Sequence, residues 1–425
     1  MLSKWQWLLK QLVGNLWWRA SILGIVALVT VLAAYVIQFQ FDLDWVLPFT
    51  VGQNSVGKIL HILATSLLGV TTFSLSVMVS AYSAASSSVT PRATKLVRQD
   101  STTHNVLATF IGAFQYSLIG IIALEAGIFN ETGRFVLFLA TIVIIVVILV
   151  ALLRWIEHLS RLGRVSETTI LVEQAAADAI AFRVEYPHLG AKLLDLSQPP
   201  SFIDNVFYFD QIGYIQHMDL QAINDCAKAQ EGELALLIQP GDFIHPKKPI
   251  GAFSGEMNED LAKLFCSHIT LGNDRTFEHD ARFGMQVMAE IASRALSPAV
   301  NDPGTASDVI ARSVRLLAKW KDHKCLDDDD ERIHYPQLYA EVLDLHSLFN
   351  DFYTPIARDG AAMIEILIRL FDALSVLKQI SPETFGTVVY QFSEEISNRG
   401  KLFLQDSTDL LRLEKERQRI FENTL

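Results

Sequence analysis

Cysteine is scarce in this chain: 425 residues contain three, at Cys226, Cys266 and Cys325. They lie far apart and lack the spacing of a metal site or of a redox motif. This pattern excludes a disulfide framework and indicates free thiols in a reducing compartment.

Catalytic motifs are also missing. The sequence has no Walker A segment, no GxGxxG after an expected strand, no HExxH and no CxxC. Its eleven histidines are scattered, and the acidic run at 327–331 lacks the spaced ligands of a calcium loop. We therefore expect no enzyme activity, no metal and no cofactor, and we interpret the acidic run as a solvated loop.

Positive charge is low in the C-terminal part of the chain. Residues 1–164 carry 11 Lys and Arg against 6 Asp and Glu, whereas the remaining residues carry 24 against 41. The acidic excess argues against nucleic acid as a partner, because phosphate binding requires Lys and Arg. The asymmetry indicates a membrane unit over residues 1–164, followed by an acidic soluble part.

Long apolar runs are what the N-terminal part does contain. A helix needs about 20 mostly apolar residues to cross about 30 Å of hydrocarbon. Four stretches meet this requirement: 20–39, 59–82, 105–128 and 135–154. Residues 1–19 mix four tryptophans with basic residues, which is typical of an interfacial helix, although a plain extension of the first span explains them equally well. No small-residue cleavage motif follows, so we expect no cleavable signal.

Charges in the short connections predict the orientation of these spans. Lys and Arg precede the first span, recur between the second and third, and follow the fourth. The connection between the first and second spans instead carries Asp42 and Asp44. Because basic residues stay on the cytoplasmic side, we expect four spans whose N-terminus and C-terminal part are both cytoplasmic.

The second span carries an unusual stripe of hydroxyl and small side chains. At about 100° per residue, its seven members fall within about 80° of one helix face. We call them the hydroxyl stripe: Thr65, Gly69, Thr72, Ser76, Ser80, Ser83 and Ser87. The helix from Ile59 is expected to run past the membrane to Ser88 and to break at Thr90-Pro91, with Thr90 capping the next helix.

Ionisable residues stand near both ends of this span. Arg92, Lys95 and Arg98 follow the break; they satisfy the positive-inside rule, and they could also ring the inner mouth of a pathway. On the outer side we single out His61 and Glu125, because an ionisable residue within a span is a functional candidate. The third span also contains small residues that permit close helix approach.

The C-terminal part is expected to be an α+β cytosolic domain. Residues 165–200 are interpreted as a connecting helix and linker, and 201–256 as a small β-rich module with alternating segments and turns. Residues 257–425 are interpreted as mainly helical, with helix after helix from about 335.

Residues 274–306 form the most distinctive soluble segment. Asp302 followed by Pro303 predicts a helix start. Good capping and packing explain the segment, and so does a ligand or subunit contact with three arginines near a helix start, which could bind an anion. The candidate residues are Arg275, Asp280, Arg282, Arg294, Asn301 and Asp302.

Several segments resemble one bacterial family. FSLSVMVSAYSAASSSVTPR, GYIQHMD, LIQPGDFIHPKKPIG and FGMQVMAEIASRALSPAVNDPGTA are similar to the membrane proteins grouped as domain of unknown function 2254. The resemblance is strong over residues 73–98 and 205–306. It implies an inner-membrane protein with a cytosolic domain. It does not supply an activity or functional residues, because the family is itself uncharacterised.

Two functions remain open at this point. The first is an oligomeric channel or passive transport protein, with the hydroxyl stripe as its wall and the cytosolic domain as an assembly or gating element. A homo-oligomer is needed because four spans enclose little space. The second is a membrane-anchored sensor or scaffold in which the stripe only packs helices. For either function, the expected partners are the lipid bilayer and a small ion or an anionic ligand. A sensor or scaffold could also bind another protein.

Overall fold

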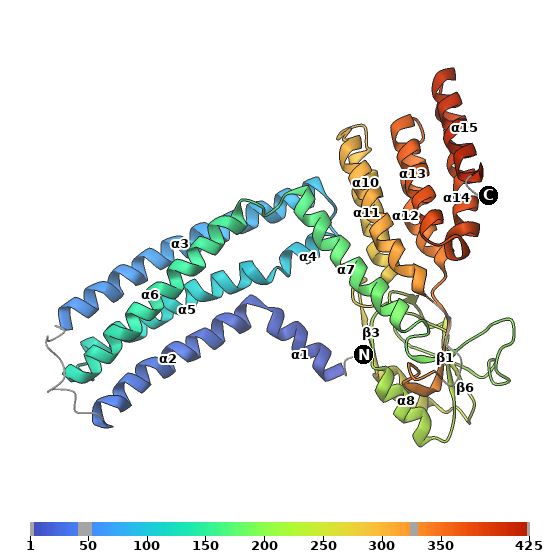
Figure 1. The fold of residues 1–425 in the computed structure, drawn as a ribbon. Coiled ribbons are helices and arrows are strands. Elements are labelled where there is room, and N and C mark those ends of the chain that lie inside the picture. Colours follow the sequence, from blue (N-terminus) through green and yellow to red (C-terminus); the bar gives the residue numbers. More distant parts are fainter. Residues whose placement is uncertain (1–3, 41–52, 324–329, 423–425) are drawn as a thin grey trace. The chain divides into compact units, whose positions relative to one another are not determined.

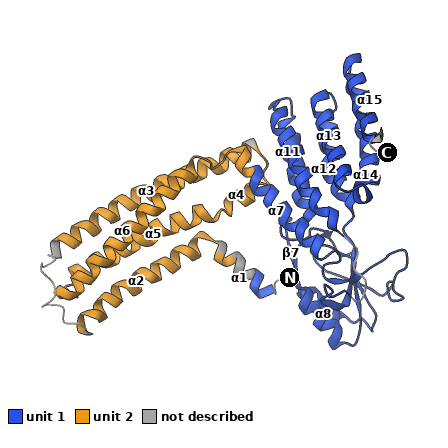
Figure 2. Ribbon diagram, viewed as in Figure 1, with its two compact units in different colours: residues 1–7, 169–425 blue, residues 8–168 orange. Residues whose placement is uncertain are grey.

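The computed structural model describes residues 4–40, 53–323 and 330–422. Asp42, Asp44, Cys325 and most of the acidic run lie outside the described residues. The chain divides into two compact units, Leu8–Thr168 and Met1–Trp7 with Thr169–Leu425 (Figure 2). We call them the apolar-helix unit and the α+β unit.

The apolar-helix unit is built from α2 (Leu16–Gln40), α3 (Gln53–Ser88), the short α4 (Thr94–Arg98), α5 (Ser101–Glu125) and α6 (Glu131–Leu159) (Figure 1). In the described part of the chain, four helical segments are long and apolar enough to cross a membrane, judged by length and composition. Each predicted span lies in one of them, except that α5 ends three residues before the expected end of the third span.

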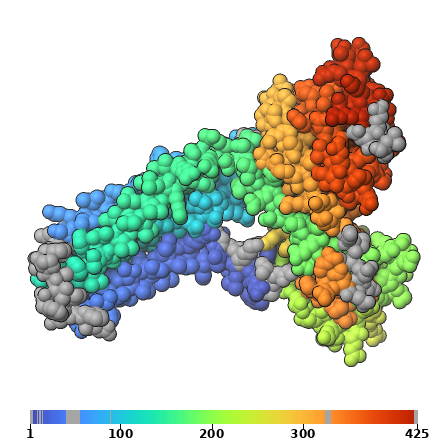
Figure 3. Space-filling view, viewed as in Figure 1, coloured from blue at the N-terminus to red at the C-terminus, as the bar shows by residue number. Residues whose placement is uncertain are grey.

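Helix α5 is the centre of this unit, because it contacts α2, α3 and α6. Its small residues make this possible: a Cβ atom at Gly112 would lie 2.6 Å from Cβ of Leu23, and one at Gly120 would lie 2.9 Å from Cδ1 of Leu60. The predicted close approach of the third span is therefore confirmed. Figure 3 shows α5 between α6 and α2 on the visible face of the unit.

The α+β unit contains two sheets among the described residues. The larger has the order β1 (Ala191–Leu193), β8 (Tyr335–Ala340), β4 (Leu234–Leu236), β6 (Pro249–Phe253) and β2 (Val206–Tyr208). The pairs β1–β8 and β4–β8 are parallel, and the others are antiparallel. The smaller is antiparallel, with the order β5 (Phe243–Ile244), β3 (Gly213–Met218) and β7 (Ile269–Gly272).

These strands correct two sequence-based expectations. The β-rich part is not confined to 201–256, because β1 precedes that range and β7 and β8 follow it. The segment from about 335 does not begin with a helix, because Tyr335–Ala340 is the strand between β1 and β4. The strands β1, β7 and β8 are short and pair with residues far away in the chain, so a local sequence pattern does not reveal them.

The helices of the α+β unit follow the expected order. They are α7 (Val165–Glu185), which begins in the other unit, α8 (Leu220–Ala229), α9 (Glu259–Ser267), α10 (Ala281–Ala295), α11 (Pro303–Leu317), a 3-10 turn (Ala318–Asp322), α12 (Leu345–Asp359), α13 (Ile364–Ile380), α14 (Pro382–Phe403) and α15 (Ser407–Glu422). Helices α10 to α14 pack through buried apolar and aromatic side chains, among them Phe349, Phe352 and Phe385.

The first turn of α1 (Lys4–Gly14) belongs to the α+β unit. Trp7 is 3% exposed, stacks on His217 with ring centroids 5.2 Å apart, and donates through Nε1 to Glu278. The backbone N–H of Lys4 donates to Asp219 at 2.7 Å. The expectation that residues 1–19 form one interfacial helix is therefore wrong for Trp7, which is a packed residue of this unit.

Candidate functional site

The hydroxyl stripe lies on the outward face of α3, and from here on we call it the α3 stripe. The opposite face of α3 is buried against its neighbours, mainly α5, through Leu60, Leu67 and Ala85 among others. All seven stripe residues are exposed in the described chain. A Cβ atom added at Gly69 would meet nothing within 4 Å. The stripe is therefore not used to pack α3 against the other helices of its own chain.

Stripe hydroxyls are hydrogen-bonded to the backbone of α3 itself. Thr65 Oγ1 donates to the carbonyl of His61 at 2.9 Å, and Thr72 Oγ1 donates to that of Leu68 at 3.0 Å. Ser76 and Ser80 continue the pattern, each donating four residues back at 3.0 Å. Because the protons point to the helix, the hydroxyl oxygens present their acceptor side outward.

Large apolar side chains border the stripe on both sides. At about 100° per residue, Phe73 lies about 60° to one side of Ser76 and Val79 about 60° to the other. Phe73 is 64% exposed and Val79 58% exposed. The outward surface of α3 is thus a narrow polar strip between two apolar edges.

The connection after α3 differs from the expectation in one respect. The helix ends at Ser88 before Thr90-Pro91, as predicted. However, α4 has five residues, and its N-cap is Ala93 without a side-chain bond, so the prediction that Thr90 caps this helix is wrong. Thr90 Oγ1 instead accepts from the backbone N–H of Arg92 at 3.1 Å, and its carbonyl accepts from the N–H of Thr94 at 3.2 Å, so Thr90 caps the turn that leads into α4.

The predicted mouth and outer residues are spread along the surface of this unit. Arg92 and Arg98 are exposed, and Lys95 is half-buried. His61 and Glu125 are exposed on different helices, and no ion pair joins them in the described part of the chain. The structure therefore does not bring His61 and Glu125 together as one site.

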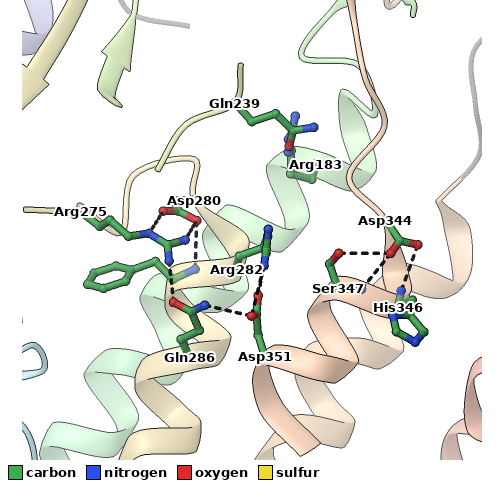
Figure 4. Close-up of polar contacts among 11 residues, drawn as sticks. Arg183, Gln239, Arg275, Asp280, Arg282, Gln286, Asp344, His346, Ser347 and Asp351 are labelled. Carbon is green, nitrogen blue, oxygen red and sulfur yellow. Dashed lines mark hydrogen bonds and ion pairs between the residues drawn. The ribbon is translucent and has the colours of Figure 1, made fainter. Parts of the chain in front are cut away.

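A second group of predicted residues meets at the start of α10. Arg275 binds both carboxylate oxygens of Asp280 at 2.8 Å, and Asp280 also caps α10 by accepting from the N–H of Phe283 at 2.9 Å (Figure 4). Arg282 pairs with Asp351 of α12 at 2.6 Å. Gln286 joins the two pairs, because it accepts from Arg275 and donates to Asp351.

The remaining residues of that group lie elsewhere. Arg294 is in the last turn of α10, about 18 Å along the helix from Arg282 at 1.5 Å per residue. The expectation that three arginines gather near one helix start is therefore wrong for Arg294. Asp302 caps α11 by accepting from the N–H of Thr305 at 3.0 Å, with Pro303 at the helix start, as predicted. Asn301 precedes it with φ of 51°.

A buried arginine also lies outside the predicted set. Arg183, in α7, is 2% exposed, and its Nη2 donates to Oε1 of Gln239. It continues a buried stripe of that helix, formed by Val172, Ala176, Ala179 and Ile180. An arginine at the next position of an apolar stripe with helical spacing was the signal available in the sequence.

These features define a class of protein: apolar helices of membrane-crossing length joined to an α+β unit. Residues 14–376 match the family described as "Predicted membrane protein (DUF2254)", and the chain belongs to this family. The resemblance of the sequence segments is thereby confirmed.

Curated relatives match a small part of the chain. Uncharacterized proteins of Mycobacterium bovis and of Mycobacterium tuberculosis are each 35% identical over 104 residues, which is 23% of this chain and 20% of the relative. The match thus spans about a fifth of the length of these relatives. No solved structure matches the chain.

Proposed function

We propose that the chain is an oligomeric channel or passive transport protein of the bacterial inner membrane. The α3 stripe would form the pathway wall, and the α+β unit would be a cytoplasmic assembly or gating domain. The observation that carries this proposal is the exposure of all seven stripe residues on the face of α3 that points away from its own neighbours. The proposal assigns no enzymatic reaction to the chain.

Packing within the chain does not account for a stripe in this position. Small and hydroxyl residues often allow helices to approach closely, but here α5 approaches the opposite face of α3. In an oligomer, the apolar edges at Phe73 and Val79 would contact neighbouring copies, and the stripe between them would face the axis. Hydroxyl oxygens that accept without binding tightly suit the wall of a conducting path.

The length of the stripe supports the same proposal. At 1.5 Å per residue, the 36 residues of α3 extend about 54 Å, which exceeds the hydrocarbon thickness of about 30 Å. Ser83 and Ser87 continue the stripe toward Arg92 and Arg98, and all four side chains are exposed. A polar strip that continues past the apolar part of the helix is expected of a water-filled path.

The alternative is a membrane-anchored sensor or scaffold, in which the stripe packs against α3 of a second copy without water between them. Both functions use an oligomer. They differ in whether water fills the space along the stripe in the assembled oligomer.

Ion or solute flux through liposomes tests the proposal. Purified full-length protein is reconstituted, and wild type is compared with Ser76→Leu and Ser80→Leu. We expect flux from wild type and at least a tenfold loss in each variant, because leucine narrows and dehydrates the wall. Ser66→Leu is the matched control, since Ser66 is exposed on the same helix but lies about 80° from the centre of the stripe.

Wild-type protein that passes neither ions nor small solutes at any voltage, pH or membrane tension would contradict the proposal. Equal loss in the Ser66→Leu control would attribute the effect to the fold of α3 rather than to the wall.

A further inference from the structure

The α+β unit contains a partly open cavity of about 300 Å³ next to the Arg275–Asp280 pair. Its wall combines the end of α7, the turn 239–243, the start of α10 and the segment 341–347 before and within α12. Figure 4 shows Arg183 and Gln239 with the Arg275–Asp280 pair on one side and Asp344 and Ser347 on the other. A volume of this size is at the lower end of the range for small-molecule sites.

Arg183 is the buried cation of this wall. Its Nη2 is bonded to Gln239, but Nε and Nη1 have no hydrogen-bond partner among the described residues, although both are buried. Burial lowers the pKa of Arg183 to about 10, which is still well above neutral pH, so the guanidinium carries its charge. Two buried nitrogens of a charged group, with three N–H donors between them, are thus left without an acceptor.

Three of the four carboxylates of the same wall are bonded to other groups, and the fourth, Glu341, has its pKa raised by burial and by the charge of Asp242. Asp280 binds Arg275, and Asp242 pairs with Lys248 at 3.0 Å. Asp344 caps α12 by accepting from the N–H groups of His346 and Ser347. The Asp242 and Asp280 charges favour the arginine from a distance, but in the described part of the chain no carboxylate binds it directly.

We propose that the cavity binds a small molecule through a carboxylate or phosphate group that pairs with the guanidinium of Arg183 and accepts from Nη1. A buried charge without a partner is costly, and proteins normally compensate it with a counter-ion or a ligand. Charge-assisted hydrogen bonds from a guanidinium to the oxygens of a carboxylate or a phosphate are among the strong ones.

The N-termini of α10 and α12 also border the cavity, but the carboxylates of Asp280 and Asp344 already cap them, so the argument rests on Arg183. Gly241 has φ of 89°, and a side chain there would collide with the Asp280 carboxylate, so the turn 239–243 must approach closely without one. This proposal does not depend on whether the α3 stripe conducts.

The test measures how anions change the unfolding temperature of the full-length protein, with affinity then determined by calorimetry. The probes are inorganic phosphate and succinate, at constant ionic strength set with chloride. A response to phosphate alone or to succinate alone identifies which oxyanion the site takes. We expect at least one of them to raise the unfolding temperature of wild type in a saturable manner.

Three variants make the test specific. Arg183→Met should remove the response, or weaken the affinity at least tenfold, without lowering the unfolding temperature of the ligand-free protein, because an uncompensated buried charge is removed. Gln239→Glu should fold and also bind more weakly, because its carboxylate would satisfy Arg183 from within. Arg358→Gln is the matched control: Arg358 is exposed, bonds to the adjacent Asp359, and should leave the response unchanged.

The proposal is overturned if neither probe affects wild type beyond chloride. It is also overturned if Arg183→Met and Gln239→Glu respond as wild type does. Should Arg183→Met fail to fold, the response of Gln239→Glu decides the question alone.

Discussion

Asp280 combines two contacts at the start of α10, a helix cap and a bidentate ion pair. Its carboxylate is almost completely buried, and the guanidinium of its partner Arg275 also donates to Gln286. Breaking a buried pair leaves one charge without compensation, whereas breaking an exposed pair costs little. Removing one charge of an ion pair should therefore lower the free energy of unfolding much more at a buried position than at an exposed one.

Asp280→Asn tests this difference. The amide keeps the shape of the cap but not the charge, so we expect the free energy of unfolding of the α+β unit to fall by about 3 kcal/mol. Glu259→Gln is the matched control, since its pair with Lys263 is exposed and its loss should not be measurable. Urea unfolding of the full-length protein, followed by fluorescence, checks both. Equal effects of the two substitutions would show that the buried pair contributes nothing of its own.

The sequence predicted some of these residues and missed others for physical reasons. Asp302 and Pro303 act within one helix turn, so a local pattern was sufficient. The partners of Arg282 and Arg183 lie 69 and 56 residues away in the chain, at Asp351 and Gln239. Such pairs follow from the packing of helices and turns, which no spacing rule encodes.

Among the elements, the first turn of α1 shows how composition can mislead. Trp5 and Trp7 have the same sequence context, but Trp5 is 77% exposed and Trp7 is packed on His217. Aromatic residues beside lysines are typical of a membrane interface, and they are equally suited to a stacked contact with a folded unit.

Replacing each tryptophan separates these two environments. We expect Trp7→Ala to lower the free energy of unfolding of the α+β unit by about 3 kcal/mol, because a buried aromatic ring and its bond to Glu278 are lost. Trp5→Ala should leave it unchanged. Thermal unfolding of the full-length protein is the measurement, and a larger effect at Trp5 would contradict this packing.

Helices were predicted better than strands. Each of the four apolar helices is identified by its composition over more than 20 residues. This signal does not depend on how the helices pack against one another. The strands β1 and β8 have three and six residues, and they are held by parallel pairing to each other across more than 130 residues of chain. Such short strands form because they pair with neighbouring strands in the sheet, and the β-propensity of their own residues does not predict them.

At the scale of the whole molecule, the chain passes between its two units twice, after Trp7 and after Thr168. The family match covers both units. The proposed function needs an assembly in which the outward face of α3 meets an axis, and a single copy leaves that face exposed. The face that the sequence singled out as narrow and hydroxylated is thus exposed in the part of the chain that the structure describes.

Cysteine accessibility along α3, in the assembled protein in native membranes, tests this central claim most directly. The three native cysteines are replaced by alanine, and single cysteines are placed at Thr72, Ser76 and Ser80 of the stripe and at Phe73 and Val79 beside it. If the stripe lines a wet path, the first three positions react with a small water-soluble thiol reagent and the two bordering positions do not. Silence at Thr72, Ser76 and Ser80, or equal labelling of all five positions, would contradict the account.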